Sequence, residues 1–353
     1  MPKIILDKQD ATYTAGESVS GVVVVPSNVT KRPTSIRIKF EGRAAVNWPV
    51  VQRTGQTSHY YTTCVTDEEI YFVEEITVLQ SGIRIKFEGK AAVNWPVVRV
   101  QRMGEKVHYL TNYATDEELY FTEEITLLPS ENDKPSEHSG LQFPFTYQLP
   151  LGLPTSFRRP KGRVFYTIEA IPTSDLSLNE DIAPAELAFI VTGKLNLTRE
   201  ILSSLNNPVQ IGDTKKLGLF RGSGNIGFTF KLEKSLFAPG EFIGFSANLE
   251  NHSKKKIESE IKLVQVMEFH AKGKMKTDTS EIVSVIGPNF FPGREEVWVG
   301  KDVLKIPKDV LPTGLGGPCK IISLQYNLMI KMGTLCRDVP ITIGEVDIIM
   351  SEL

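Results

Sequence analysis

The stretch Tyr13-Thr-Ala-Gly-Glu-Ser-Val19 returns in the second half of the chain as Phe237-Ala-Pro-Gly-Glu-Phe-Ile243. Each version is an aromatic residue, a turn that contains Gly-Glu, and the start of an apolar run. Further along, an Asn-x-Thr or Asn-x-Ser turn with nearby lysines recurs at Asn28 and Asn251, and each turn leads into another predicted strand. This recurrence indicates two related β-domains built on one plan.

A second, closer repeat lies inside the first half. Residues Ile36-Arg-Ile-Lys-Phe-Glu-Gly-Arg-Ala-Ala-Val-Asn-Trp-Pro-Val50 recur as Ile83-Arg-Ile-Lys-Phe-Glu-Gly-Lys-Ala-Ala-Val-Asn-Trp-Pro-Val97. The run Asp67-Glu-Glu-Ile-Tyr-Phe72 likewise recurs as Asp116-Glu-Glu-Leu-Tyr-Phe121. The near identity indicates a recent local duplication.

The duplicated segments, 36–79 and 83–128, pose a packing problem. Each predicts about three strands from its alternating residues, and a sandwich built around one segment has no vacant core for the other. The extra strands must lengthen the sheets, stack as an appendage or displace the first copy. Two copies do not make a solenoid, because repeat arrays need at least three units. We expect duplicated coding segments, with use of only one at a time as a hypothesis.

The amino-acid composition limits the classes of function that the chain can have. The 353 residues are 41% hydrophobic and 23% charged, as in soluble globular proteins. A net charge of −2 supplies no overall basic field for nucleic acid, so no nucleic-acid partner is expected. No apolar run approaches the roughly 20 residues that span a bilayer, and the N-terminus lacks the apolar core of a signal peptide.

The cysteines fit a reducing compartment. Cys64, Cys319 and Cys336 are odd in number and widely spaced. Without an export signal, reduced thiols in the cytosol are the simplest account. We therefore expect a cytoplasmic protein.

Hydrophobic periodicity sets the fold class. Residues 36–41 and 228–233 alternate apolar and polar side chains, which is typical of strands with one buried face. Short strands without helices between them favour antiparallel sandwiches over βαβ units. The one helix candidate is 198–205, with Thr198 as its N-cap, and we take it as part of the linker between the two halves.

We thus predict an all-β chain of two antiparallel, immunoglobulin-like β-sandwiches. The N-terminal sandwich is expected at 1–197, with the duplicated three-strand segment inside it. A linker at 198–208 leads to the C-terminal sandwich at 209–353.

No enzyme signature emerges. Gly222-Ser-Gly-Asn-Ile-Gly227 has the glycine spacing of dinucleotide sites, but it precedes a strand pattern rather than a helix, which favours a hairpin turn. The histidines and cysteines lack metal-site spacing. We therefore predict no enzyme, no cofactor and no metal. A hydrolase that uses Cys319 or Cys336 is the remaining enzymatic alternative.

Two lysine groups are candidates for binding the phosphate of inositol lipids or phosphopeptides. One follows the Asn251 turn and the other alternates along a predicted strand. The plainer interpretation, that these lysines keep strand ends soluble and block edge pairing, is favoured because screened surface lysines are common. The candidates are Lys254, Lys255, Lys256, Lys272, Lys274 and Lys276.

The chain resembles the arrestin family, and most of all the α-arrestins, the arrestin-domain-containing proteins. The resemblance covers nearly the whole chain in the family's order, apart from the second copy of the short repeat. It rests on Tyr13–Gly21, Phe143–Phe157, Gly162–Ile168, Phe237–Ile243, Asn251–Ile257 and Val339–Gly344.

The resemblance implies two β-sandwiches joined by a short linker and a role without catalysis. Family members are cytoplasmic adaptors that link membrane receptors, channels or transporters to ubiquitin ligases and endocytic coats. We expect a scaffold at the plasma membrane or endosomes that grips cytoplasmic tails with its sandwich faces and strand edges. The alternative is an arrestin-fold subunit of a stable, retromer-like sorting coat.

Two family features have no match in the sequence. Many α-arrestins recruit ligases through Pro-Pro-x-Tyr motifs; this sequence has none, so direct recruitment is not expected. We find no counterpart of the charged core that senses receptor phosphates. Residues 254–256 fall where some arrestins bind inositol phosphates, which implies that anionic lipids at the membrane surface are a partner to consider.

Overall fold

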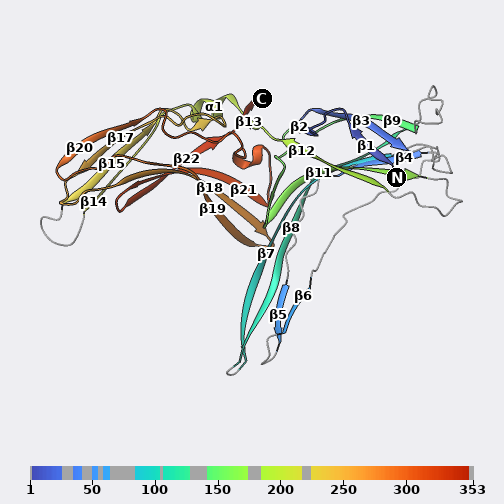
Figure 1. Ribbon diagram of the computed structural model, residues 1–353, viewed down its shortest axis with the longest axis horizontal. Coiled ribbons are helices and arrows are strands. Elements are labelled where there is room, and N and C mark those ends of the chain that lie inside the picture. Colours follow the sequence, from blue (N-terminus) through green and yellow to red (C-terminus); the bar gives the residue numbers. More distant parts are fainter. Residues whose placement is uncertain are drawn as a thin grey trace. The chain divides into compact units, whose positions relative to one another are not determined.

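Most of the described part of the chain is β-strand. The computed structural model describes residues 2–25, 35–41, 50–54, 59–63, 84–103, 106–127, 141–173, 184–216 and 224–349. Figure 1 shows these residues as layered strands with one short α-helix. The all-β prediction is confirmed.

Two compact units make up the chain. The first consists of residues 1–193 with the short segments 269–276 and 319–322, and the second of 194–268, 277–318 and 323–353. The sandwich limits expected at 1–197 and 209–353 stay predictions.

The first sandwich has a small sheet in the order β1-β3-β9. Alternate side chains of its strands face the core, among them Val19 and Val23 of β3 and Phe143 and Phe145 of β9. The strands are β1 Lys3–Leu6, β3 Ser18–Val25 and β9 Leu141–Gln148.

The larger sheet of this sandwich has the order β2-β12-β11-β4-β7-β8, with β10 paired to β11. The sheets meet through aromatic rings: Phe121 of β8 lies 6.0 Å from Tyr147 of β9 and 6.1 Å from Tyr166 of β11, centroid to centroid. Such pairs add stability beyond the area they bury. The strands are β2 Thr12–Thr14, β4 Ser35–Glu41, β7 Arg84–Met103, β8 Lys106–Leu127, β10 Phe157–Arg159, β11 Gly162–Thr173 and β12 Ala185–Thr192.

The duplicated segments take several places in this sandwich. In the second copy, β7 and β8 pair from Ile85 to Met103 as one long hairpin that runs beyond the sheet (Figure 1). In the first copy, β4 joins the sheet, while β5 Val50–Thr54 and β6 His59–Thr63 form a separate two-stranded hairpin. The third predicted strand of the first copy, around 71–79, lies outside the described residues.

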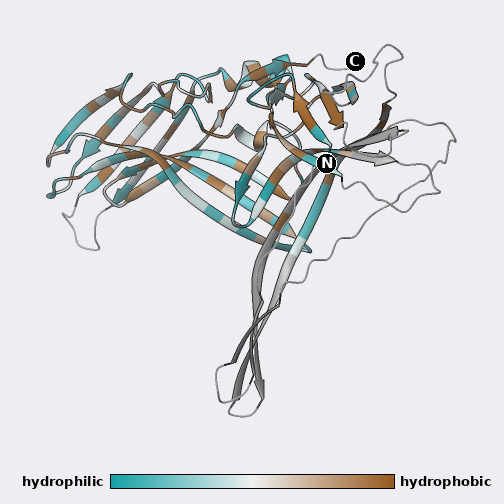
Figure 2. Cartoon of the chain, turned by 45° about the vertical axis from the view of Figure 1, so that its right-hand side comes forward, coloured by the Kyte–Doolittle hydropathy of each residue, from teal (hydrophilic) through white to brown (hydrophobic). Residues whose placement is uncertain are grey.

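The second sandwich has sheets in the orders β14-β15-β17-β20 and β16-β22-β21-β18-β19. Every second residue of β18 is buried, and Figure 2 shows apolar and polar residues alternating along these strands. The strands are β14 Val209–Lys216, β15 Asn225–Leu232, β16 Leu236–Phe237, β17 Phe245–Asn251, β18 Ser259–Ala271, β19 Lys274–Ile286, β20 Arg294–Gly300, β21 Ile322–Met332 and β22 Leu335–Ile343.

A short segment precedes this sandwich in the chain. Strand β13 Leu195–Leu197 pairs in parallel with β23 Val346–Ile348, and helix α1 Arg199–Leu205 follows β13. The Thr198 hydroxyl accepts a hydrogen bond from the Ile201 amide at 3.4 Å, so the predicted helix and its N-cap are confirmed. A short 3₁₀ turn, η1 Thr313–Gly316, in which Gly314 and Leu315 have positive φ, lies between β20 and β21.

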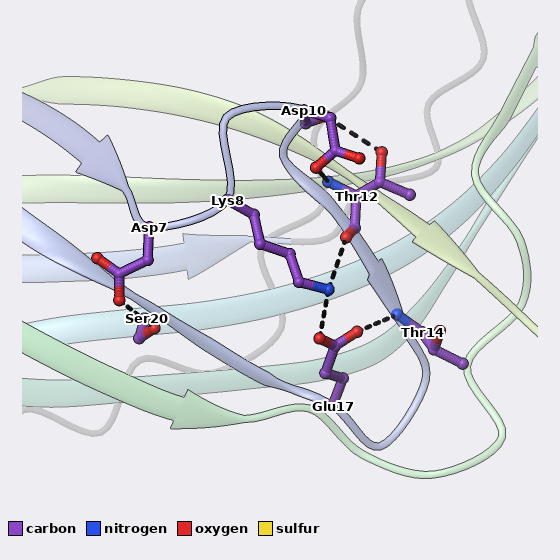
Figure 3. Close-up of polar contacts among 7 residues, drawn as sticks. All are labelled: Asp7, Lys8, Asp10, Thr12, Thr14, Glu17 and Ser20. Carbon is purple, nitrogen blue, oxygen red and sulfur yellow. Dashed lines mark hydrogen bonds and ion pairs between the residues drawn. The ribbon is translucent and has the colours of Figure 1, made fainter.

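The Gly-Glu stretch of the first sandwich forms a tight polar turn (Figure 3). The Glu17 carboxylate accepts a hydrogen bond from the Thr14 amide at 2.9 Å and pairs with Lys8. The Lys8 ammonium lies 4.9 Å from the centroid of the buried Tyr13 ring, a cation–π contact. Gly16 supplies the positive φ of +83° that the turn requires.

The second sandwich repeats this turn. The Glu241 carboxylate accepts from the Ala238 amide at 2.8 Å and pairs with Lys234 at 2.6 Å, and the Lys234 ammonium lies 5.2 Å from the Phe237 ring centroid. Gly240 has a φ of +85°. Tyr13 lies on the short strand β2, which pairs in parallel with β12. Phe237 lies on the short strand β16, which pairs in parallel with β22. The long-range repeat therefore marks one structural plan used twice.

The glycine-rich pattern at 222–227 is followed by a strand, as predicted. Strand β15 begins at Asn225, and Gly224 has a φ of +74°. Residues 222 and 223 lie outside the described residues. No helix begins here, so the segment lacks the helix N-terminus that would meet a pyrophosphate.

Candidate interaction surface

A buried asparagine shapes the loop that carries the first lysine group. We call residues 252–256, between β17 and β18, the lysine loop. Asn251 is 1% exposed, and its Nδ2 donates to the carbonyls of Lys255 at 2.8 Å and Phe290 at 2.9 Å. Its Oδ1 accepts from the Ser253 amide at 3.0 Å, which is the predicted Asx turn. The loop is thus fixed from inside the protein.

Two further contacts hold the lysine loop. The buried Ser253 hydroxyl lies 2.6 Å from Asn251 Oδ1 and accepts from the Lys255 amide at 3.1 Å. The loop also passes close to Gly224, where an added Cβ would lie 2.0 Å from the His252 carbonyl oxygen. A residue other than glycine at this position would push the loop away.

The side chains of Lys254, Lys255 and Lys256 are exposed on this fixed loop. Lys256 lies 3.9 Å from Glu258, a weak surface pair. For Lys254 and Lys255, the structure shows no acidic partner at ion-pair distance within the residues it describes. Three consecutive cations on a preformed loop suit an anionic ligand, because little ordering is needed when it binds.

The second lysine group lies at the turn between β18 and β19. Lys272 and Gly273 have φ values of +46° and +72°, as in the two-residue turns that join antiparallel strands. Lys272 is therefore a turn residue, and the prediction that it alternates with the others on one strand is wrong. Lys274, half-buried, and Lys276, exposed, do lie on β19.

The two lysine groups do not form one surface. The lysine loop precedes the first residue of β18 and the turn follows its last residue. A strand of 13 residues spans roughly 40 Å, which separates the groups. Phosphate or lipid binding by either group stays a prediction.

Strand edges offer a second kind of surface. In the described residues, β20 pairs with β17 on one side and with no strand on the other. Val297 and Val299 of β20 are 66% and 55% exposed, whereas Trp298 between them packs edge-on against Phe245 at 4.9 Å. Strand β1 ends the small sheet of the first sandwich in the same way and exposes Ile5. Open edges of this kind accept extended peptides.

The cysteines do not form a catalytic arrangement in the described residues. Burial raises the pKa of the Cys319 thiol to about 11, so this thiol is protonated at neutral pH and is a poor nucleophile. Cys336 is exposed, and Cys64 lies outside the described residues. Across the described ranges, no three His, Cys, Asp or Glu residues gather as metal ligands would. Nor is any described helix long and apolar enough to span a membrane.

Comparison with known families matches this architecture. The model of the arrestin (or S-antigen) C-terminal domain matches residues 222–348, and that of the N-terminal domain matches 2–82 and again 72–198. The chain belongs to the arrestin family. The double match of the N-terminal model coincides with the duplicated segment.

Individual relatives agree. The chain is 25% identical to arrestin domain-containing protein 17 of Caenorhabditis elegans over 98% of its own length and 70% of the relative's. It is 29% identical to human arrestin domain-containing protein 4 and 26% identical to mouse thioredoxin-interacting protein, over 60% and 58% of its length and half of each relative. These relatives confirm the predicted likeness to α-arrestins and support a general adaptor role.

Proposed function

We propose that this protein is a cytoplasmic adaptor that binds the cytoplasmic tails of membrane receptors, channels or transporters. It links them to endocytic trafficking, ubiquitination or signalling machinery at the plasma membrane or endosomes, and it catalyses no reaction. Membership of the arrestin family is the observation that carries the proposal. The open strand edges supply a physical means of binding.

Binding proceeds by strand addition. An extended tail pairs its backbone with the open edge of β20, and the backbone hydrogen bonds supply affinity without sequence preference. The exposed Val297 and Val299 add apolar contacts that favour tails with β-branched or aromatic residues at alternate positions. The lysine loop of the same sandwich supports this role by attracting anionic lipid headgroups at the membrane surface.

Proximity labelling in cells tests the proposal. We expect the full chain, fused to a labelling enzyme, to mark membrane receptors, channels or transporters. Val297→Arg with Val299→Arg places charges on the edge and should reduce this labelling at least about tenfold. The matched change of both valines to threonine keeps their β-branched shape and adds no charge, so it should reduce this labelling far less. If no membrane proteins are labelled, the adaptor role is contradicted. If the unmodified chain, the arginine variant and the threonine variant label them equally, only the proposal that tails bind at the β20 edge is rejected.

The alternative of a stable sorting-coat subunit gives a different result on purification. An obligate coat subunit elutes from a native column with partners in fixed ratio, whereas an adaptor elutes largely alone. Native mass spectrometry of the protein purified from cells separates the two. A constant complex of defined mass would replace the adaptor proposal by the coat proposal.

A further inference from the structure

Strands from both duplicated copies share one edge of β11. Residues 35–41 of β4, from the first copy, pair with 167–173 of β11. Residues 90–93 of β7, from the second copy, pair with 162–165. The opposite edge of β11 is occupied by β10 and β12. One edge is thus divided end to end between two versions of the same sequence.

The two versions use the same register on β11. Ile38 of the first copy lies opposite Ala170. Its equivalent in the second copy is Ile85, and continuing the register of β7 along β11 places Ile85 opposite Ala170 as well. Each copy, extended along the whole edge, would therefore occupy the positions that the other now holds.

Strand β8 shows the same equivalence. Glu124 of β8 pairs with Lys39 of β4 and also with Lys86 of β7, which are one position in the two copies. Strand β4 of the first copy therefore pairs with β8, which belongs to the second copy, and it does so in the same register as β7. Either copy fits between β11 and β8.

Both copies also form their own distal hairpin. Val50 pairs with Thr63 in β5–β6, and Val97 pairs with Asn112 in β7–β8. Val50 is equivalent to Val97, and Thr63 to Asn112, so the two hairpins begin in one register. In the residues that the structure describes, each copy therefore has both a strand that pairs with β11 and a hairpin of its own. The arrestin N-terminal domain model, which matches the chain once through each copy, agrees.

We infer that the edge of β11, residues 162–173, is a single acceptor site for which the two copies compete. The chain has two states, with either the first or the second copy seated along the entire edge. In each state the other copy is displaced from β11. The duplication therefore acts as an intramolecular strand exchange that leaves the register of the sandwich unchanged.

The two states are close in free energy. Along the seated strand, residues 36–46 and 83–93 differ only by Arg43 in place of Lys90. When the first copy pairs with β11, the chain segment that links β3 to the paired strand is short and the segment that leads on to β9 is long. When the second copy pairs with β11, the first segment is long and the second is short. Loop-closure entropy depends only on the logarithm of loop length, so the connections nearly balance. We expect populations within roughly tenfold of each other.

Disulfide trapping in the full chain tests the exchange. Native cysteines are first replaced by serine. Glu169→Cys is then combined with Lys39→Cys, its partner on β4, or with Lys86→Cys, its partner only when the second copy is seated. Under mild oxidation at low concentration, we expect both pairs to form within one chain. The 39–169 pair also serves as the folding control.

A register control accompanies these variants. Glu169→Cys with Lys90→Cys should not form a bond, because Lys90 lies opposite Phe165 in the structure and when the second copy is seated. Adding Lys39→Pro, which removes a pairing amide from the first copy, should increase the yield of the 86–169 bond. If 39–169 goes to completion without any 86–169 bond, or if 86–169 links only separate chains, the exchange is ruled out.

Discussion

At the scale of single residues, Glu17 and Glu241 hold the most informative positions. Each closes a turn by accepting an amide hydrogen bond and pairs with a lysine that covers an aromatic ring. A carboxylate is needed for both contacts at once. This explains why Gly-Glu recurs while the residues between the aromatic ring and the glycine vary.

The charge on Glu17 makes a small, pH-dependent contribution to stability. The Lys8 hydrogen bond lowers the pKa of the Glu17 carboxyl from 4.5. Its stabilising effect is therefore present above about pH 4.5 and is lost as the pH falls through the lower pKa of the folded state. Glu17→Gln should cost under about 1 kcal/mol at pH 7, because the pair is partly exposed, and the cost should vanish at low pH.

Chemical denaturation of both proteins at several pH values measures this difference. Glu233→Gln, at an exposed position just after β15, is a control for changing a carboxyl outside this turn. A cost for Glu17→Gln that stays constant from pH 7 to pH 3 would show that the charge is not involved.

Some of this residue-level detail could be predicted and some could not. The Gly-Glu turn and the Asn251 turn follow from local residue preferences. The pairing of Lys8 with Glu17 and of Lys234 with Glu241 was not predicted. The two lysines stand at different distances along the chain from their glutamates, so aligning the two stretches does not bring them together.

At the scale of elements, the two lysine groups carry the same number of lysines, but the backbone that holds each group is fixed to a different degree. The loop is fixed by the buried Asn251, whereas the second group is spread over a turn and a strand. Lys254→Ala, Lys255→Ala and Lys256→Ala together should weaken binding to phosphatidylinositol-phosphate vesicles by up to roughly 100-fold, since each basic residue contributes about 1 kcal/mol.

The matched control replaces Lys272, Lys274 and Lys276 by alanine, with an equal change in net charge. It should affect vesicle sedimentation much less. Equal losses in both triple variants would indicate general electrostatic attraction, and unchanged binding in the first would end the proposal of a lipid site.

The misplacement of Lys272 shows a limit of periodicity. Residues 272–276 alternate lysine with other residues, and a period of two predicts one strand face. The turn at Lys272 and Gly273 has only two residues, so the alternation continues across it without a break. Positive φ at a lysine is uncommon and leaves no signal in the pattern.

At the scale of the whole molecule, the fold class could be predicted but the use of the duplicated segment could not. Local alternation is enough to identify strands. Which strands share an edge depends on pairing between distant segments, and here two nearly identical segments suit the same edge of β11. The sequence left lengthening, stacking and displacement open; the structure combines a shared edge with a separate β5–β6 hairpin.

If β11 has one place for two equivalent copies, removing either should preserve the fold. Deleting residues 36–82 joins Ser35 to Ile83, and deleting 80–128 joins Leu79 to Pro129; each leaves one complete copy. Both variants should unfold cooperatively in calorimetry, with midpoints within about 4 °C of each other, which corresponds to about 1 kcal/mol for sandwiches of this size.

Deleting residues 36–128 removes both copies and is the negative control for the two single-copy variants. It removes every strand that pairs with this edge of β11, along with Phe121, whose ring joins the two sheets, and should abolish cooperative unfolding of the first sandwich. Suppose that one single-copy variant unfolds cooperatively while the other does not. The two copies are then not equivalent, because nearly the same residues in the same register pair stably with β11 in one case and not in the other.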